Sequence, residues 1–337
     1  MKRILITLLC SLSISAMAQD PHFSQFYASP LTLNPALTGR FDGKMRLASN
    51  YKNQWPSINN AFTTGTASLD FPILGNRIPE FDTWGVGIIG LSDQSGNKIL
   101  RNNYVGLSTA YSKSLDENGY HQLTVGFQGV MAYKRLDVSM ADFEDELTPF
   151  GFTGVTSEIF SNQQVAINYF DLNAGLMYSA STNGYNSFYA GVSMYHINRA
   201  RETFLGGNYF LEPRMTVHGG GYSPVGAGGN TVLHASFIHQ RQSGASETVL
   251  GGAVSHSFNG DEDQPTALYL GGWYRLKDAF IPYVGLEVQN LRFGLTYDLN
   301  SSSLRTASAG RGGTEMSLIY IFKPADPFLR KNNCPKF

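Results

Sequence analysis

Cysteine, charge and long apolar runs are all scarce in this chain, and each shortage excludes a class of protein. Cys10 and Cys334 are the only cysteines among 337 residues, too few for a disulfide framework or a cysteine-rich metal site. Charged residues make up 15%, whereas about a quarter is usual in soluble domains. The formal net charge of -1 leaves no basic excess that would favour nucleic acid.

The only long apolar stretch is at the start. A basic beginning, an apolar stretch from 4 to 14 and an Ala-Met-Ala cleavage pattern at 16–18 predict a secretory signal peptide over residues 1–18, with a retained membrane helix as the alternative. No later run reaches the about 20 residues that a spanning helix needs. If the mature chain lies in a membrane, it must therefore be a closed barrel, because an open sheet would leave backbone groups unpaired in hydrocarbon.

Glycine and aromatic residues, by contrast, are plentiful, with 36 glycines and 13% aromatics. From about residue 43, apolar residues recur at every second position, the period of a strand. Phe170 and Leu172, for example, alternate with Asp171 and Asn173. The second face is rich in small polar residues, which suits the lumen of a barrel better than the core of a soluble sandwich, the alternative all-β architecture.

We therefore expect an all-β protein, a transmembrane antiparallel β-barrel of about 14 strands over residues 43–322. The strands are expected near 43–52, 61–71, 82–93, 99–114, 120–136, 165–180, 186–199, 210–223, 230–242, 246–258, 265–277, 280–288, 290–299 and 313–322. Short turns rich in Asn, Asp and Gly would be periplasmic. The longest connection, 137–164, would be an external, acidic, solvated loop, with a cation or partner site as the alternative.

Residues 19–42 form a separate N-terminal segment. Its three prolines exclude a regular central strand or helix, yet it is too apolar for a free tail. We predict a plug inside the barrel or a lid across its periplasmic mouth, and a docking strip for a periplasmic partner is the alternative. The residues expected to carry this role are Pro21, His22, Phe23, Phe26, Tyr27, Asn34 and Pro35.

Charges on the expected inner face gather late in the chain. Glu287, Arg292, Asp298 and Glu315 come from three successive expected strands and share the polar face. A lumen charge ladder that holds these residues in pairs is the main interpretation, and a conducting eyelet is the alternative.

The last residues, 323–337, predict a short periplasmic C-terminal tail with three prolines and several basic residues. Phe328 and Phe337 suggest contact with a partner or with the underside of the barrel, and a disordered tail is equally compatible. Cys334 is a candidate for an intermolecular disulfide.

Seven histidines and abundant serines raise the question of an enzyme. His234 and His239 lie five positions apart, so they face opposite sides of one strand and cannot join a single cluster. No G-x-S-x-G element occurs in a strand–turn–helix context. We expect scattered structural histidines, no metal, no cofactor and no catalysis.

Both ends of the mature chain resemble one family. The opening PHFSQFYASPL (21–31) and NPALTG (34–39), the closing hairpin FGLTYDLNSSSL (293–304) and GGTEMSLIYIF (312–322), and the final CPKF are similar to the PorP/SprF family. These are outer-membrane proteins of the type IX secretion and gliding machinery of Bacteroidetes. The resemblance covers nearly the whole mature chain, with its specific motifs at the two ends.

The resemblance implies a non-catalytic, integral outer-membrane component, exported through its signal peptide. It implies a role in exporting or retaining a partner, notably the C-terminal domain of a large surface adhesin, or in linking the membrane to periplasmic machinery. Expected partners are therefore type IX secretion components, a secreted adhesin and outer-membrane lipid, without nucleic acid. The polar inner face and the Asn34-Pro35-Ala36 step suggest an alternative, a FadL-like or porin-like transporter of a small solute. An outer-membrane hydrolase is a third possibility.

Overall fold

The computed structural model describes residues 20–58, 61–75, 77–157, 159, 164–182, 186–204, 207–226, 229–259, 265–303 and 305–323. The predicted signal peptide and all but the first residue of the predicted C-terminal tail, with Phe328, Cys334 and Phe337, lie outside these residues.

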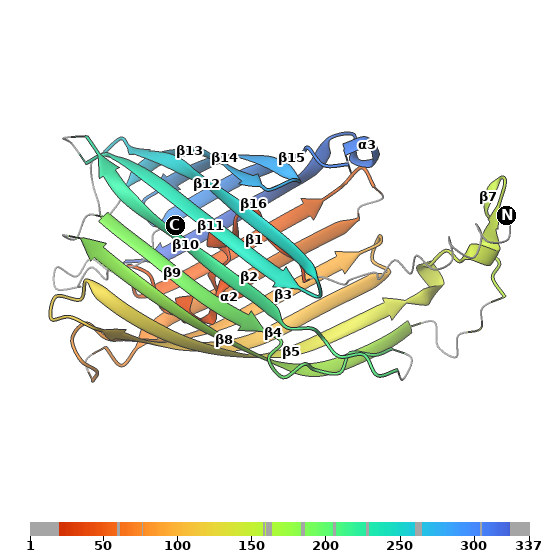
Figure 1. Cartoon of the computed structure of the whole chain (residues 1–337), viewed down its shortest axis with the longest axis horizontal. Helices are drawn as coiled ribbons and strands as arrows, with labels where there is room; N and C mark the ends of the chain where they lie inside the picture. Colours follow the sequence, from red (N-terminus) through yellow and green to blue (C-terminus); the bar gives the residue numbers. More distant parts are fainter. Residues whose placement is uncertain are drawn as a thin grey trace, which may run out of the picture.

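Fourteen strands pair in chain order, each antiparallel to its neighbours, and β1 pairs with β16 to close the sheet (Figure 1). These strands are β1 (Met45–Gln54), β2 (Phe62–Ile73), β3 (Thr83–Ser95), β4 (Leu100–Ser114), β5 (His121–Asp137), β8 (Gln164–Thr182), β9 (Asn186–Tyr195), β10 (Arg214–Val225), β11 (Thr231–Gln242), β12 (Ala245–Ser257), β13 (Thr266–Arg275), β14 (Ala279–Val288), β15 (Leu291–Asn300) and β16 (Arg311–Phe322). Closure removes both sheet edges, so the barrel and its predicted strand number are confirmed and the sandwich alternative is wrong.

The two faces of the sheet are also as predicted. Leu107 exposes 68% of its surface, whereas the next residue along β4, Ser108, exposes 4%. The same inversion separates Phe127 from Gln128 on β5. This arrangement, with apolar side chains outside and polar ones inside, is the reverse of that in a soluble β-protein. It matches a barrel wall that faces lipid.

The remaining elements are short. They are η1 (Phe26–Ala28), α2 (Pro30–Leu33), η2 (Pro35–Leu37), η3 (Val138–Met140), η4 (Glu144–Glu146), β6 (Leu147–Thr148), β7 (Gly151–Phe152) and α3 (Arg305–Ser308). No helix among the described residues combines the length and the apolar character needed to cross a membrane.

Two local predictions need correction. The expected strand 186–199 ends earlier, with β9 at Tyr195, because His196 and Arg199 take positive φ values of 61° and 46° that break the extended backbone. The connection 137–164 is not wholly irregular, since β6 and β7 form a small hairpin within it. Figure 1 shows this connection projecting well beyond the end of the barrel.

The connections differ in length between the two ends of the barrel. The one between β5 and β8 and the one between β9 and β10 leave from one end, whereas the two-residue turn Gln289–Asn290 lies at the other. Long connections are external and short turns periplasmic in bacterial outer-membrane barrels. We accordingly call these the outer end and the inner end, and β1 begins at the inner end.

A charge at the middle of the outward face tests the lipid-facing assignment. Leu107→Arg, halfway along β4, should lower the free energy of unfolding by about 2–4 kcal/mol, because the guanidinium enters hydrocarbon. Leu115→Arg, at another exposed position in an inner-end turn, should cost about 0–1 kcal/mol. Urea unfolding in liposomes, followed by heat-modifiable gel mobility, measures both, and equal costs would contradict the assignment.

Candidate functional site

The N-terminal segment, here residues 20–42, lies inside the barrel. Leu31, Asn34 and Ala36 are completely buried, and η2 contacts the inner faces of β4, β5 and β8. Figure 1 shows the short helices of this segment within the ring of strands. From the inner end, where β1 begins, the segment runs back through the lumen to Asp20, which contacts the outer-end residues described below. It therefore spans most of the lumen.

An arginine–aspartate pair holds the segment at the inner end. Arg46 of β1 donates to both carboxylate oxygens of Asp70 on β2, at 3.0 and 2.7 Å. Arg46 Nη2 also donates to the carbonyl of Leu37 at 2.9 Å, and Asp70 Oδ2 accepts from the amide of Gly39 at 2.7 Å. Both members of the bidentate pair thus also hydrogen-bond to the backbone of the segment.

Asn34 joins the middle of the segment to three strands. Its Oδ1 accepts from the amide of Ala36 at 2.9 Å and caps η2, in which Pro35 takes the first position. Its Nδ2 lies 3.2 Å from the carbonyl oxygen of Leu176, 3.3 Å from that of Val192 and 2.9 Å from Nε2 of His218. Asn34 and Pro35, two of the predicted residues, are therefore in the lumen.

Glycines in the wall make room for this close approach. A Cβ at Gly175 of β8 would stand 1.8 Å from Oδ1 of Asn34. A Cβ at Gly126 of β5 would stand 2.4 Å from the carbonyl carbon of Pro35. A side chain at either position would collide with the segment, so the wall and the segment are shaped to one another.

Two carboxylates hold the segment near the outer end. Glu315 of β16 accepts from the amides of Ser24 and Gln25 at 2.6 and 2.8 Å. Asp298 of β15 accepts from the hydroxyl of Ser24 at 2.9 Å and from Nη2 of Arg275 on β13 at 2.8 Å. Asp298 therefore has both a counterion and a segment group as partners, and Glu315 is bound through the backbone amides of the segment.

The four charges of the predicted ladder do not form one ladder. Glu287 and Arg292 form a pair at 3.0 Å near the inner end, where Glu287 also accepts from the hydroxyl of Tyr269. Asp298 and Glu315 lie near the outer end and bind the segment. Glu287 and Arg292 are paired with one another as expected, whereas Asp298 pairs with Arg275, which was not among the predicted residues. Alternation assigns a face of the strand but does not give the height of each residue along the barrel axis.

The predicted aromatic residues of the segment lie in the lumen, where Phe26 is buried and Tyr27 is half-buried. The ring of Tyr27 lies 5.5 Å from that of Phe26, 5.0 Å from that of Trp273 and 5.9 Å from that of Tyr283, measured between centroids. Phe23 is also buried. The lumen is therefore partly apolar, whereas alternation alone suggested mainly small polar residues.

The remaining predicted residues lie toward the outer end. Nε2 of His22 is 2.8 Å from a carboxylate oxygen of Glu247 on β12, and Pro21 lines a cavity. Sequence reasoning missed Arg46, Asp70 and Arg275, although each falls on an inward position of its strand. The sequence shows each of them as a charged residue on the polar face of its strand. Nothing in the sequence shows that these residues bind the N-terminal segment.

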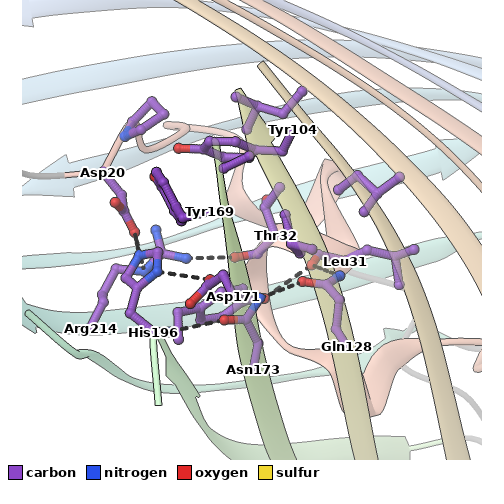
Figure 2. Close-up of a pocket in the computed structure, with 16 residues that line it drawn as sticks. Asp20, Leu31, Thr32, Tyr104, Gln128, Tyr169, Asp171, Asn173, His196 and Arg214 are labelled. Atoms are coloured by element: carbon purple, nitrogen blue, oxygen red, sulfur yellow. Dashed lines mark hydrogen bonds and ion pairs between the residues drawn. The ribbon is translucent and has the colours of Figure 1, made fainter. Parts of the chain in front are cut away.

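The cavity lies beside Asp20 and has a volume of about 560 Å³ when counted out to its open side. Its lining residues are Asp20, Pro21, Leu31, Thr32, Ile89, Leu91, Tyr104, Gln128, Val130, Ala132, Tyr169, Asp171, Asn173, Tyr195, His196 and Arg214. Figure 2 shows the charged side chains together at one end of the cavity.

The charged end is centred on His196, which directly follows β9. Its Nε2 is 2.6 Å from Oδ2 of Asp20, and its Nδ1 is 2.8 Å from Oδ2 of Asp171 on β8 (Figure 2). Nε of Arg214 on β10 lies 3.6 Å from the same oxygen of Asp20. The guanidinium of Arg214 also stacks on the ring of Tyr195, 4.3 Å from its centroid.

These contacts shift the pKa values of the two groups outside the strands. Burial alone would lower the pKa of His196, but the carboxylates of Asp20 and Asp171 outweigh it and raise the pKa to about 9. Burial would likewise raise the pKa of Asp20, but His196 and Arg214 hold it well below its ordinary value of 3.8. Asp20 and His196 are therefore a charged pair at neutral pH.

In the described ranges, no group of three or more His, Cys, Asp and Glu side chains is placed to hold a metal ion. Of the histidines, His218 and His234 are buried in the lumen, whereas His239 faces outward. The opposite faces expected for His234 and His239 are confirmed.

Comparison with known proteins gives one family. The profile of the family described as type IX secretion system membrane protein PorP/SprF matches residues 15–320. None of the curated proteins compared with the chain matches it significantly.

Several solved outer-membrane structures are distantly similar. BamA from Haemophilus ducreyi lacking POTRA domains 1-3 has 10% identity over 83% of this chain and 70% of that chain, with a TM-score of 0.42. The Pseudomonas putida toluene transporter TodX has 9% identity over 90% and 94%, with a TM-score of 0.48. A Pseudomonas aeruginosa FadL homologue has 11% identity over 86% and 93%, with a TM-score of 0.44. At these values the structures add nothing to the fold described above.

The anchor formed by Asp20 and His196 should weaken as pH rises. The raised pKa of His196 means that its contribution is complete below 6.5 and is lost as pH rises through about 9. The lowered pKa of Asp20 means that its contribution is complete above 3.8 and is lost only in acid. His196→Gln should therefore lower the free energy of unfolding by about 1.5–3 kcal/mol at pH 6 and by much less at pH 10. Urea unfolding at the two pH values measures the difference.

The outward-facing His239 provides the control for this measurement. His239→Gln should cost little at either pH, because the contact that its ring makes within the described residues is with the hydroxyl of Thr248, on the outward face. A cost of His196→Gln that stays constant between the two pH values would contradict the charged anchor.

Proposed function

This chain belongs to the PorP/SprF family of type IX secretion system membrane proteins, and from that premise we propose that it binds a secreted partner without catalysing a reaction. It is an outer-membrane β-barrel with a secretion-associated role. The proposal includes export through the predicted signal peptide and binding of a partner's type IX C-terminal domain, such as that of a surface adhesin. It also includes contact of the inner-end segments with periplasmic machinery that serves secretion or gliding.

The N-terminal segment acts in this proposal as a resident plug. Its support is the series of contacts at three heights of the lumen, from Arg46 and Asp70 through Asn34 to Glu315. Hydrogen bonds to charged groups contribute about 1.5–3 kcal/mol each, so expelling the whole segment would be costly. In this proposal the secreted partner binds at the ends of the barrel and does not pass through the lumen.

The observation that carries partner binding is the apolar surface of the projecting connection between β5 and β8. Five of its large apolar residues are more than half exposed, although the connection projects beyond the part of the barrel that faces lipid. They are Leu147, Phe150, Phe152, Val155 and Ile159. Phe150, at the tip of the hairpin, is 100% exposed. Exposed apolar groups beside the acidic η4 fit a partner with an apolar patch and a basic rim. The predicted solvated acidic loop thus becomes a proposed partner site.

Capture by this hairpin can be tested in native membranes. Phe150→Ser with Phe152→Ser should reduce recovery of the secreted partner with the tagged barrel by roughly tenfold, because two aromatic anchors are lost. The matched control is Leu74→Ser with Leu115→Ser, two exposed apolar residues in inner-end turns, which should leave that recovery unchanged. Cross-linked co-purification with mass spectrometry measures it. Recovery of the wild-type barrel without any secretion component or secreted protein would contradict the proposal.

The plug can be separated from the transporter alternative by conductance. In planar bilayers the wild-type barrel should show no steady channel, whereas Gly175→Val should conduct because its side chain displaces Asn34. Gly90→Val is the matched control, since the nearest atoms to a Cβ there are 4.0 Å away. Steady single-channel conductance of the wild type would favour a FadL-like or porin-like transporter.

A further inference from the structure

We propose that the cavity beside Asp20 binds a small amphipathic molecule with a carboxylate head and an apolar body, whose head takes the place of the Asp20 carboxylate. The proposal is independent of partner binding by the β6–β7 hairpin. It concerns only residues of the lumen wall and the first described residues of the N-terminal segment.

The cavity walls suit an apolar body. Away from the charged end they are formed by Leu31 of the segment and by inward aliphatic and aromatic side chains of β3, β4, β5 and β8. These side chains belong to Ile89, Leu91, Tyr104, Val130, Ala132 and Tyr169. Apolar walls with a few polar groups at one end are typical of small-molecule sites.

The charged end is already a carboxylate site. His196 and Arg214 are more than nine-tenths buried, and both approach one oxygen of Asp20. Buried cations need a counterion, and the chain supplies its own. If Asp20 moves away, Asp171 is the one carboxylate of the described residues that still pairs with His196 or Arg214. This end of the cavity then carries a net positive charge that attracts another anion.

Asp20 fills this site imperfectly. Its distance of 3.6 Å from Nε of Arg214 is too long for a hydrogen bond, and this buried Nε donates none among the described residues. Oδ1 of Asp171, also buried at the cavity, likewise accepts none from the described part of the chain. A carboxylate head free of the segment backbone can approach the guanidinium more closely and satisfy its donor.

Asp20 can also leave without dislodging the rest of the segment. Within the described part of the chain its backbone makes a single hydrogen bond, from its amide to Oε1 of Gln242 at 2.9 Å. Four residues further along, Ser24 is bound through both its amide and its hydroxyl to Glu315 and Asp298. Exchange at the cavity therefore needs a movement of only the first few residues, and the plug stays in place.

Binding of decanoate to the full mature chain in amphipol, measured by titration calorimetry, tests the proposal. Decanoate should bind saturably, and decan-1-ol, which has the same tail without the charge, at least about tenfold more weakly. Asp20→Asn removes the competing carboxylate and should tighten decanoate binding by about tenfold, whereas Arg214→Met should weaken it by at least that factor. Arg199→Met is the matched control: this exposed arginine of the connection between β9 and β10 pairs with Glu212, and its loss should leave decanoate binding unchanged.

Two results would overturn the proposal. One is equal binding of decanoate and decan-1-ol, and the other is the absence of saturable decanoate binding to Asp20→Asn. If Arg214→Met fails to form a heat-modifiable barrel, Ala132→Phe takes its place, since it fills the cavity and leaves every charge intact. Unchanged decanoate affinity in that variant would equally exclude the cavity as the site.

Discussion

The constraint on which the whole structure depends is that hydrocarbon offers no hydrogen-bond partner to a peptide group. Every strand of the wall must therefore pair on both sides, and the sheet closes through β1 and β16. Once the ring is closed, alternation along each strand sends one face to lipid and the other to the lumen. The apolar outer surface, the polar inner surface and the need to fill the interior all follow from this closure.

Filling the interior explains the buried charges. A buried ion pair gains little stability over an apolar pair of the same size, because both ions lose their hydration. In this lumen each pair has a further task. Arg46 with Asp70, and Arg275 with Asp298, direct their spare donors and acceptors at groups of the N-terminal segment, so the charges define its path through the barrel.

The sequence was sufficient to predict the barrel, its strand number and its two faces, because those depend on a local period of two. It also marked Phe23 and Phe26 as apolar residues of a segment that must be buried. It could not reveal that Asp20 meets His196 or that Ser24 meets Glu315, since these contacts depend on strand register and on height along the axis. The β6–β7 hairpin was missed for a different reason: strands of two residues carry no periodicity.

The contact between Ser24 and Glu315 joins residues 291 positions apart in the sequence. Contacts of such long sequence separation form slowly, because most of the chain must first be ordered. The pairing of β1 with β16 also requires most of the chain to be ordered first, because β16 is the last strand in the sequence. Pairing of β1 with β16 and enclosure of the N-terminal segment are thus one late event in assembly. A partly inserted chain lacks both a closed barrel and the contact of the N-terminal segment with β16.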